Sequence, residues 1–333
     1  MCLYHGDTEA QGKIINSQVT NKYLREPRDS VVKIGWGIVH LQRMTATSKL
    51  PGLQLSFRDT AFDPNAAERY CLVLQVDRER LTLAVLDNLT NDFLAFESWY
   101  FKKAVTDAQM AEQIERLITD HEWLSNGFKR ADAIVTSEKF TFVPAALFDS
   151  AATREYLAFN APVDTKDVVN NDVLRQADAR NVYAFDSKLE KVLLKISSSI
   201  RIRHHLSPLA EKVLAASKNQ NEKRIHAHIR QGQFDFVASE NGKLLLANVF
   251  TYHSPEDFIY FLLFAAEQLK LNPEKFELEI SGEVEEKSAL AAIANKYIRN
   301  VKFAERQNGR YAEGFNQFPK HYHYNLFALH FWS

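Results

Sequence analysis

The chain has 333 residues, which is long enough for one large domain or two domains of medium size. Hydrophobic residues make up 46% of it and include 23 Phe, so a substantial and aromatic-rich core is expected. Lys and Arg total 41 and Asp and Glu total 42, and the resulting net charge of -1 excludes the basic surface of a general nucleic-acid binder.

The cysteines and the apolar runs indicate the cellular compartment. Two scattered cysteines, Cys2 and Cys71, make neither a disulfide framework nor a zinc-ribbon spacing, which favours a reducing compartment. The longest apolar run, at 258–266, is far shorter than the roughly 20 residues that cross a bilayer. We therefore expect a cytoplasmic protein without a membrane span.

Residues 1–65 are interpreted as a leader that is poorly ordered. The part at 1–43 mixes isolated Gly, Arg and Trp without a clean period and contains no signal-peptide pattern. Met44 then opens a more ordinary start. Residues 1–43 are therefore either upstream sequence that is not translated natively or a disordered leader.

A regular pattern of strands and helices begins after the leader. Apolar runs predict three strands, at 70–76, 81–86 and 93–101, and the first of these joins the second through a polar turn at 77–80. A capping box from Thr106 to Gln109 opens an amphipathic helix. The remaining elements expected in this half are a strand at 133–136, a break at Val143-Pro144, a short helix capped by Asp149, a polar connection at 160–180, a strand at 182–185 and a helix opened by a capping box at 187–190.

The second half of the chain has the same layout. A half-exposed strand at 199–205 and a helix that starts at Ser207-Pro208 lead into it. Asn241-Gly242 is a strong hairpin signal, because both residues tolerate a positive φ angle. The other expected elements are strands at 224–230, 233–239 and 243–252, a helix from 254, a strand at 277–281, a helix at 285–297, a strand at 301–303, a polar loop at 306–324 and an apolar end at 325–332 that must dock on the core.

The order of three strands, helix, strand, helix and strand thus occurs twice. A duplicated unit of this kind predicts two similar α/β lobes with a cleft between them. We assign the first lobe to residues 66–197 and the second lobe, with a C-terminal segment, to residues 198–333.

From about Leu53 onward the chain resembles the actin-like ATPase superfamily, and more closely a bacterial family of unknown function with that fold. The resemblance implies two ribonuclease-H-like lobes, each a mixed sheet flanked by helices. A more distant likeness is to the actin-like assembly proteins of type IV pili. The stretches that carry the resemblance are YCLVLQV with TLAVLD, FTFVP at 140–144, NVYAFD at 181–186, the paired histidines at 204–205 and LEISGEVEEKSAL at 278–290.

Active members of this superfamily bind ATP and magnesium with two turns and one strand-helix junction. The resemblance places Asp77 in the first turn, but Arg78-Glu79-Arg80 replaces the glycine that lets backbone N–H groups approach phosphate. The second turn, 230–233, keeps Gly232 and has no carboxylate. The junction keeps one glycine, Gly282, followed by an acidic residue.

We therefore predict a non-catalytic protein of this fold that acts as a binding or assembly module with a protein partner and without nucleic acid or cofactor. The alternative is a weak nucleotide-binding protein or ATPase that holds ATP and magnesium with Asp77, Gly232 and Gly282. Each of the three also has an ordinary interpretation, as a turn residue or as the start of a helix.

Histidines and arginines offer two further candidate sites. His226 and His228 share one strand face and could bind a metal with His204 or His205, although strand histidines are commonly solvated. His321 is interpreted, with His323, as a surface or packing residue. A basic strip on the second lobe for an acidic partner is conceivable from the arginines at 201, 203, 224 and 230, although arginine on a solvated strand face is the ordinary case. We expect no metal site.

Overall fold

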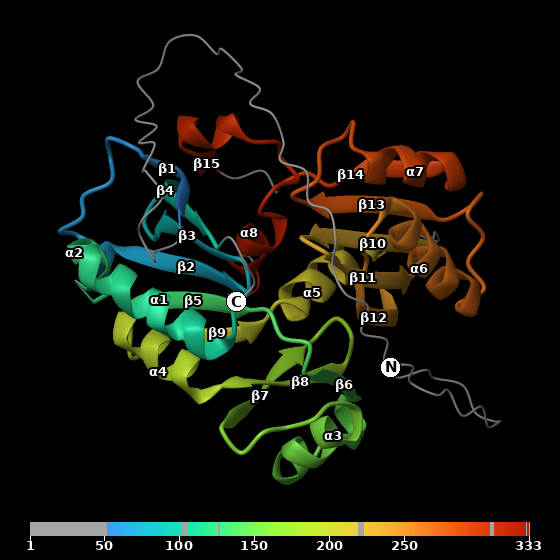
Figure 1. Cartoon of the computed structure of the whole chain (residues 1–333), viewed down its shortest axis with the longest axis horizontal. Helices are drawn as coiled ribbons and strands as arrows, with labels where there is room; N and C mark the ends of the chain where they lie inside the picture. The colour runs from blue at the N-terminus through green and yellow to red at the C-terminus, as the bar shows by residue number, and fades with distance from the viewer. Residues whose placement is uncertain are drawn as a thin grey trace, which may run out of the picture. The chain divides into compact units, whose positions relative to one another are not determined.

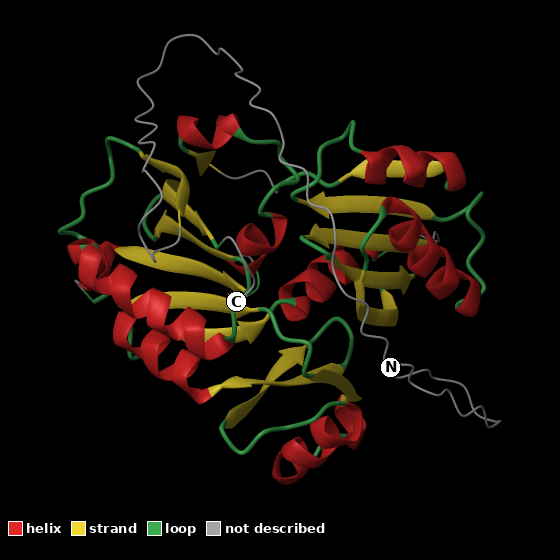
Figure 2. Cartoon of the chain, in the orientation of Figure 1, coloured by secondary structure: helices red, strands yellow, loops and turns green. Residues whose placement is uncertain are grey.

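The computed structural model describes residues 52–101, 105–125, 127–218, 223–306, 310–330 and 332. All of them belong to one compact unit. The segment considered to be untranslated, 1–43, lies outside the described residues. Three groups of strands carry the architecture, each with helices packed on it (Figure 2).

The first sheet has seven strands. Six of them follow the order β1-β4-β3-β2-β5-β9, and β15 pairs with the first two residues of β4 (Figure 1). Strands β1 to β4 pair antiparallel, whereas β5 and β9 extend the sheet in parallel from β2. The bounds are β1 Gly52–Arg58, β2 Tyr70–Asp77, β3 Arg80–Asp87, β4 Asp92–Tyr100, β5 Arg130–Val135, β9 Arg201–His204 and β15 Arg310–Tyr311, and the 3-10 turn η1 covers Ala67–Arg69.

Part of the stretch interpreted as a leader is therefore the ordered strand β1. Its alternating Leu55 and Phe57 pack against the core, and its backbone pairs with β4 along the edge of the sheet. Tertiary pairing orders a segment whose own sequence gives only a weak signal. The sequence predicts a boundary between the two lobes at residue 197. Strand β9 lies beyond this residue but belongs to the first sheet, and the described residues form one unit. The boundary between the lobes therefore stays a prediction.

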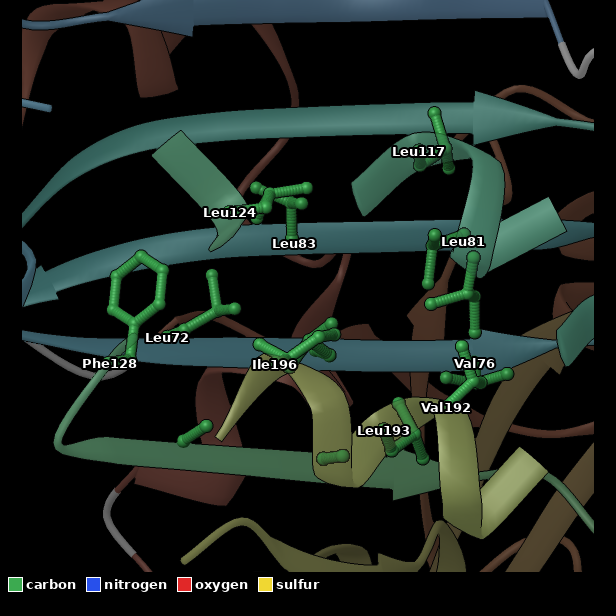
Figure 3. Packing of buried hydrophobic residues seen from close by; sticks show 14 of the residues in the cluster. Leu72, Val76, Leu81, Leu83, Leu117, Leu124, Phe128, Val192, Leu193 and Ile196 are labelled. Atoms are coloured by element: carbon green, nitrogen blue, oxygen red, sulfur yellow. The ribbon is translucent and has the colours of Figure 1, made fainter. Parts of the chain in front are cut away.

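Helices α1 (Asp107–Asp120), α2 (Glu122–Ser125) and α4 (Ser187–Ile196) cover one face of the first sheet. Figure 3 shows the side chains of β2 and β3 meeting Leu117 of α1 and Leu193 of α4 in this layer. Each fully buried leucine contributes about 1.5–3 kcal/mol of transfer free energy. The capping box predicted at Thr106 is confirmed, with both of its reciprocal hydrogen bonds present.

The C-terminal segment, defined here as residues 310–330, covers the other face of the first sheet. It contains β15, the 3-10 turn η4 (Glu313–Gln317) and α8 (Tyr324–His330). Phe315 and Phe327 are buried against Phe93 of β4, with ring centroids 6.1 and 5.0 Å from it. The apolar end predicted to dock does so, on the first lobe.

The second sheet has the order β12-β11-β10-β13-β14. Helices α6 (Pro255–Gln268) and α7 (Ala289–Tyr297) pack on one face, and α5 (Leu206–Ser217) packs on the other face. The hairpin predicted at Asn241-Gly242 is confirmed, with φ angles of 54° and 75°. The strand bounds are β10 Lys223–Arg230, β11 Gln233–Glu240, β12 Lys243–Thr251, β13 Glu277–Gly282 and β14 Asn300–Phe303.

A third, three-stranded sheet is inserted between β5 and α4, in the order β6-β8-β7. Its strands are β6 (Phe140–Pro144), β7 (Asp167–Leu174) and β8 (Ala179–Asp186). The 3-10 turns η2 (Ala145–Leu147) and η3 (Ser150–Ala152) and the helix α3 (Thr153–Asn160) follow β6.

One prediction in this insertion was wrong. The polar connection at 160–180 contains β7, whose Asn and Asp residues lie on an edge strand that gains its hydrogen bonds from β8. The break predicted at Val143-Pro144 is confirmed as the end of β6, a strand that the pattern itself did not predict and whose end tolerates a proline. The cap predicted for Asp149 is confirmed, because its side chain accepts from the Ala151 N–H group.

Two helix starts also differ from the sequence pattern by one residue. Asp186, rather than Ser187, caps α4, because its carboxylate accepts from the Lys188 N–H group at 2.8 Å. Helix α5 begins at Leu206, before the Ser-Pro pair that predicts its start. Apart from the insertion and the strands β1 and β15, the two main sheets share one pattern, in which three antiparallel strands, β4-β3-β2 or β12-β11-β10, are followed by two parallel strands. Within the described part of the chain, no helix is both long and apolar enough to cross a membrane.

Candidate functional site

A cleft of about 420 Å³ lies where the β2–β3 hairpin faces the β10–β11 hairpin. The predicted site residues Asp77 and Gly282 both line it. Gly232 has a positive φ of 67°, does not belong to the lining, and accepts a hydrogen bond from the Tyr252 N–H group at 2.9 Å. The fold therefore brings together two of the three predicted residues. The lining residues are Gln75, Asp77, Arg78, Glu79, Arg80, Thr82, Tyr100, His228, Ile229, Arg230, Gln231, Gln233, Tyr252, Gly282, Glu283, Leu290 and His323.

Asp77 ends β2 and is held by its own turn and by the opposite hairpin. One carboxylate oxygen accepts from the Arg78 N–H group at 2.6 Å, and the other lies 3.5 Å from Nη1 of Arg230. Tyr100 makes a second link, since its hydroxyl donates to Oε1 of Gln231 at 3.0 Å. The two turns that the resemblance assigns to phosphate are thus joined to each other by side chains.

Arg230 is the most buried cation of the cleft, with 9% of its side chain exposed. Its Nη2 donates to Oδ1 of Asp235, which is fully buried, at 2.7 Å. Burial opposes the charge of both groups, yet their mutual attraction outweighs it, so the pKa of Arg230 is raised and the pKa of Asp235 is lowered. Removing one partner would leave the other charge buried and uncompensated.

Gly282 ends β13 in a conformation that side chains rarely adopt, with a φ of 93°. A Cβ atom at this position would lie 2.1 Å from the carbonyl oxygen of Ile229, so the close approach of β10 and β13 requires glycine. The Gly282 N–H group donates to the carbonyl of His321 at 2.9 Å. The backbone donor at the strand-helix junction is therefore occupied by the C-terminal segment.

A second ion pair crosses the cleft, between Arg80 of β3 and Glu283 just after β13. Nδ1 of His323 lies 3.4 Å from the same glutamate. Burial, and then the positive charge of Arg80, lower the pKa of His323 to about 3, so its ring is neutral at physiological pH.

A hydrogen-bonded chain runs under the cleft between β10 and β13. Nδ1 of His226 lies 2.8 Å from Glu279, and its Nε2 lies 2.7 Å from Oγ of Ser281. Nδ1 of His228 lies 2.8 Å from the same hydroxyl. The Glu-His-Ser order resembles a nucleophilic triad, but Ser281 is fully buried and the neighbouring Gly282 N–H group is engaged, so the serine has neither access nor an oxyanion donor.

The histidines are packing and hydrogen-bonding residues. His226, at 1% exposed, is not the solvated strand residue that the sequence favours. His204 bonds the side chain of Asn181 and the carbonyl of Ser137, and His205 bonds Asp235. Among the described residues, no group of three or more His, Cys, Asp or Glu side chains is placed to hold a metal ion.

The four arginines considered for a basic strip do not form one, because they lie in two sheets and are paired with carboxylates. Those at 201 and 203 lie on β9 in the first sheet, and those at 224 and 230 on β10 in the second. Sequence reasoning also missed His228 and His323 as lining residues of the cleft. The alternating His226-Ala227-His228 stretch places both strand histidines on one face, but nothing local predicts that α5 and the C-terminal segment bury that face. The ion pairs are Arg201–Asp132, Arg203–Asp172, Arg224–Glu277 and Arg230–Asp235.

Comparison with protein families identifies the chain. Residues 59–301 match the family described as protein of unknown function (DUF3822). The chain belongs to this family. The match covers most strands of both main sheets and every lining residue of the cleft except His323, and it assigns no activity. No curated protein matches the sequence.

Two solved structures show the fold of this DUF3822 protein. A Bacteroides thetaiotaomicron protein with an actin-like ATPase fold and unknown function is 22% identical, with a TM-score of 0.67 over 73% of this chain and 93% of that chain. The PilM–PilN type IV pilus biogenesis complex contains a chain that is 12% identical, with a TM-score of 0.52 over 78% of this chain and 97% of that chain. The actin-like ATPase fold predicted from the sequence is confirmed.

Proposed function

We propose that this DUF3822 protein is a non-catalytic binding or assembly module that uses the actin-like fold as a scaffold. Its location would be the cytoplasm of a bacterium, its partner a protein, and it would need neither cofactor nor nucleic acid. The geometry of the cleft supports this proposal, because the groups that would meet a nucleotide already bind each other.

One observation carries the proposal. Asp77, the residue that would orient a hydrated magnesium ion, faces Arg230 at 3.5 Å, and Arg230 is anchored by a buried aspartate. A triphosphate in this place would have to separate the two turns and leave the carboxylates next to its own negative charge. Separating this partly solvated pair costs about 1 kcal/mol or less, and the repulsion between the freed carboxylate and the triphosphate adds to that cost.

The C-terminal segment adds a second argument. It begins on the first sheet at β15, bonds Gly282 of the second lobe through His321, and returns to the first sheet as α8. The side chain of Asn325 also donates to the carbonyl of His205, at 2.8 Å. A segment that joins both lobes twice would restrict the opening on which a nucleotide cycle depends, and it suits a rigid scaffold.

A protein partner is favoured by the likeness to PilM, which is found in a type IV pilus biogenesis complex. That structure is a protein–protein assembly built on the same fold. We carry over only the class of partner, a protein, because the identity between the two chains is 12%.

Isothermal titration calorimetry with Mg-ATP tests the proposal. The wild-type protein should bind Mg-ATP no more tightly than about 1 mM. Binding tighter than this that is lost in Asp77→Ala, and kept in a matched surface variant such as Glu115→Ala on α1, would reverse the conclusion. The alternative, a weak nucleotide-binding protein or ATPase with Asp77, Gly232 and Gly282 at the ligand, would then hold.

A further inference from the structure

Strand β12 is an open edge of the second sheet (Figure 1). The strand order places it last, and among the described residues it pairs with β11 alone. It is nine residues long, contains no proline, and has one charged residue, Lys243, at its first position. Folded proteins commonly protect a long edge strand with prolines or charges, because an unprotected edge pairs readily with another strand. The edge of β12 is therefore suited to such pairing.

The backbone register shows which groups of β12 point away from β11. The Tyr252 N–H group donates to the carbonyl of Gly232 at 2.9 Å, so these two residues form a hydrogen-bonded pair. Bonded and non-bonded pairs alternate along an antiparallel ladder. Counting back from Tyr252, the outward backbone groups are therefore those of Thr251, Val249 and Ala247. In the part of the chain that the structure describes, no backbone–backbone hydrogen bond occupies these outward groups.

A row of aromatic rings continues from this edge onto α6. Phe250 of β12 stacks on Phe261 of α6 with ring centroids 5.9 Å apart, and Phe261 contacts Tyr260 at 5.3 Å. Tyr260 in turn stacks on Phe264 at 6.2 Å. Tyr260 is 62% exposed and Phe264 is 44% exposed. Large exposed aromatic side chains beside an open strand edge indicate a surface that a partner covers.

We infer that a second copy of this chain pairs with β12 in an antiparallel arrangement, around a two-fold axis at Val249. This axis pairs Ala247 of one copy with Thr251 of the other, and it joins two five-stranded sheets into one sheet of ten strands. A two-fold axis between antiparallel strands stands perpendicular to the sheet, so the α6 helices of both copies lie on the same face. The two aromatic rows then meet beside the paired Phe250 rings.

The charges around β12 favour a copy of this chain as the occupant. Within residues 247–251 no side chain is charged, so the antiparallel register opposes no like charges. The two ends of the strand carry opposite charges, because Lys243 opens it whereas Glu256 and Asp257 follow it in the first turn of α6. Antiparallel pairing turns the lysine end of each copy towards the acidic end of the other. Such an isologous contact closes on itself and gives a dimer rather than a filament.

Analytical ultracentrifugation of the full-length protein at about 1–100 μM tests the inference. The wild type should form a dimer with a dissociation constant of about 10 μM or lower. Val249→Pro removes an outward N–H group and should abolish the dimer while the ladder with β11 persists, since an edge strand tolerates proline where its N–H group faces solvent. The double variant Tyr260→Glu/Phe264→Glu should raise the dissociation constant by about 10-fold or more. Phe159→Glu, at a residue that is 91% exposed on α3, is the matched control and should leave it unchanged.

The thermal unfolding midpoint of each variant controls for folding. If Val249→Pro does not fold, the double variant decides, because both of its positions are exposed. A protein that stays monomeric at about 100 μM overturns the inference and leaves the edge to a strand of another protein. A dimer that survives the substitutions at β12 and α6, or that Phe159→Glu weakens equally, also overturns it. The inference goes beyond the proposed function, because none of the residues substituted here lines the cleft, and binding of Mg-ATP at Asp77 would overturn the proposed function alone.

Discussion

The substitution Arg230→Met tests the buried ion pair on which the cleft depends. Methionine keeps the length and the aliphatic contacts of the side chain and removes the guanidinium. Asp235, fully buried and 2.7 Å from that guanidinium, then keeps His205, at 3.2 Å, as its hydrogen-bonding side chain among the described residues. Asp77, with 19% of its side chain exposed, can recover hydration. The damage should therefore be concentrated at Asp235.

The expected loss in the free energy of unfolding at pH 7 is about 3–5 kcal/mol, the range found when one partner of a buried pair is removed. This is a large fraction of the 5–15 kcal/mol that stabilises a typical domain. Asp77→Asn should cost about 1 kcal/mol or less, because its pair with Arg230 is longer and better solvated. The double variant Arg230→Met/Asp235→Leu should recover most of the loss, since it removes both charges.

The loss should also depend on pH with a defined sign. In the wild type the pKa of Asp235 is lowered, so its contribution is present above the usual aspartate pKa of about 3.9 and disappears as the pH falls through the native value. Without Arg230, burial raises that pKa, and the folded protein takes up a proton more readily. The difference between wild type and Arg230→Met should therefore shrink as the pH falls from 7 towards 4.

Urea unfolding followed by far-UV circular dichroism at pH 7, 5.5 and 4.5 measures these differences. The slope with denaturant must stay unchanged for the comparison to hold. A loss below about 1 kcal/mol for Arg230→Met, or a loss that grows at lower pH, would refute the reasoning.

Three further predictions test other parts of the structure. Gly282→Ala should destabilise the protein by more than about 2 kcal/mol, because its Cβ atom would lie 2.1 Å from a backbone oxygen. The control Gly127→Ala, at a φ of 72° in open space, should cost about 1 kcal/mol, and thermal unfolding compares the two variants. Phe327→Ala, which empties a site buried against the first sheet, should cost about 3–5 kcal/mol, and Phe159→Ala, at 91% exposed, should stay within about 0.5 kcal/mol in urea unfolding. Burial lowers the pKa of His323 to about 3, so below about pH 6.5 this ring takes up a proton on unfolding and the free energy of unfolding should fall as the pH drops. The variant His323→Asn keeps a residue that tolerates positive φ and should reduce the slope of the unfolding free energy against pH by about 1.4 kcal/mol per pH unit. An unchanged slope would contradict the assignment.

Much of the fold could be predicted from the sequence because its signals are local. The apolar alternation of residues 70–86, the capping box at Thr106 and the Asn241-Gly242 turn each depend on neighbours within a few positions, and the structure confirms them. Repetition of the same order in both halves then indicates two lobes. Strand β7 was missed because its Asn and Asp residues become a strand only by pairing with β8.

The candidate site was predicted in part, for the same physical reason. Asp77 and Gly282 could be located by their place after predicted strands, and the missing glycine in the first turn already argued against a phosphate site. The partners of these residues lie far away in the sequence: Arg230 is 153 positions after Asp77, and His321 is 39 positions after Gly282. No local pattern encodes such distances.

The sequence by itself determined the order of strands and helices, its repetition in both halves and the absence of glycine from the turn at 77–80, because periodicity and glycine placement act within one element. Only the tertiary structure decided that the arginines are ion-paired, that the histidines are buried, and that the C-terminal segment engages both lobes. Burial and charge pairing arise where separate elements meet, and their energies depend on the local dielectric environment that the packed chain creates.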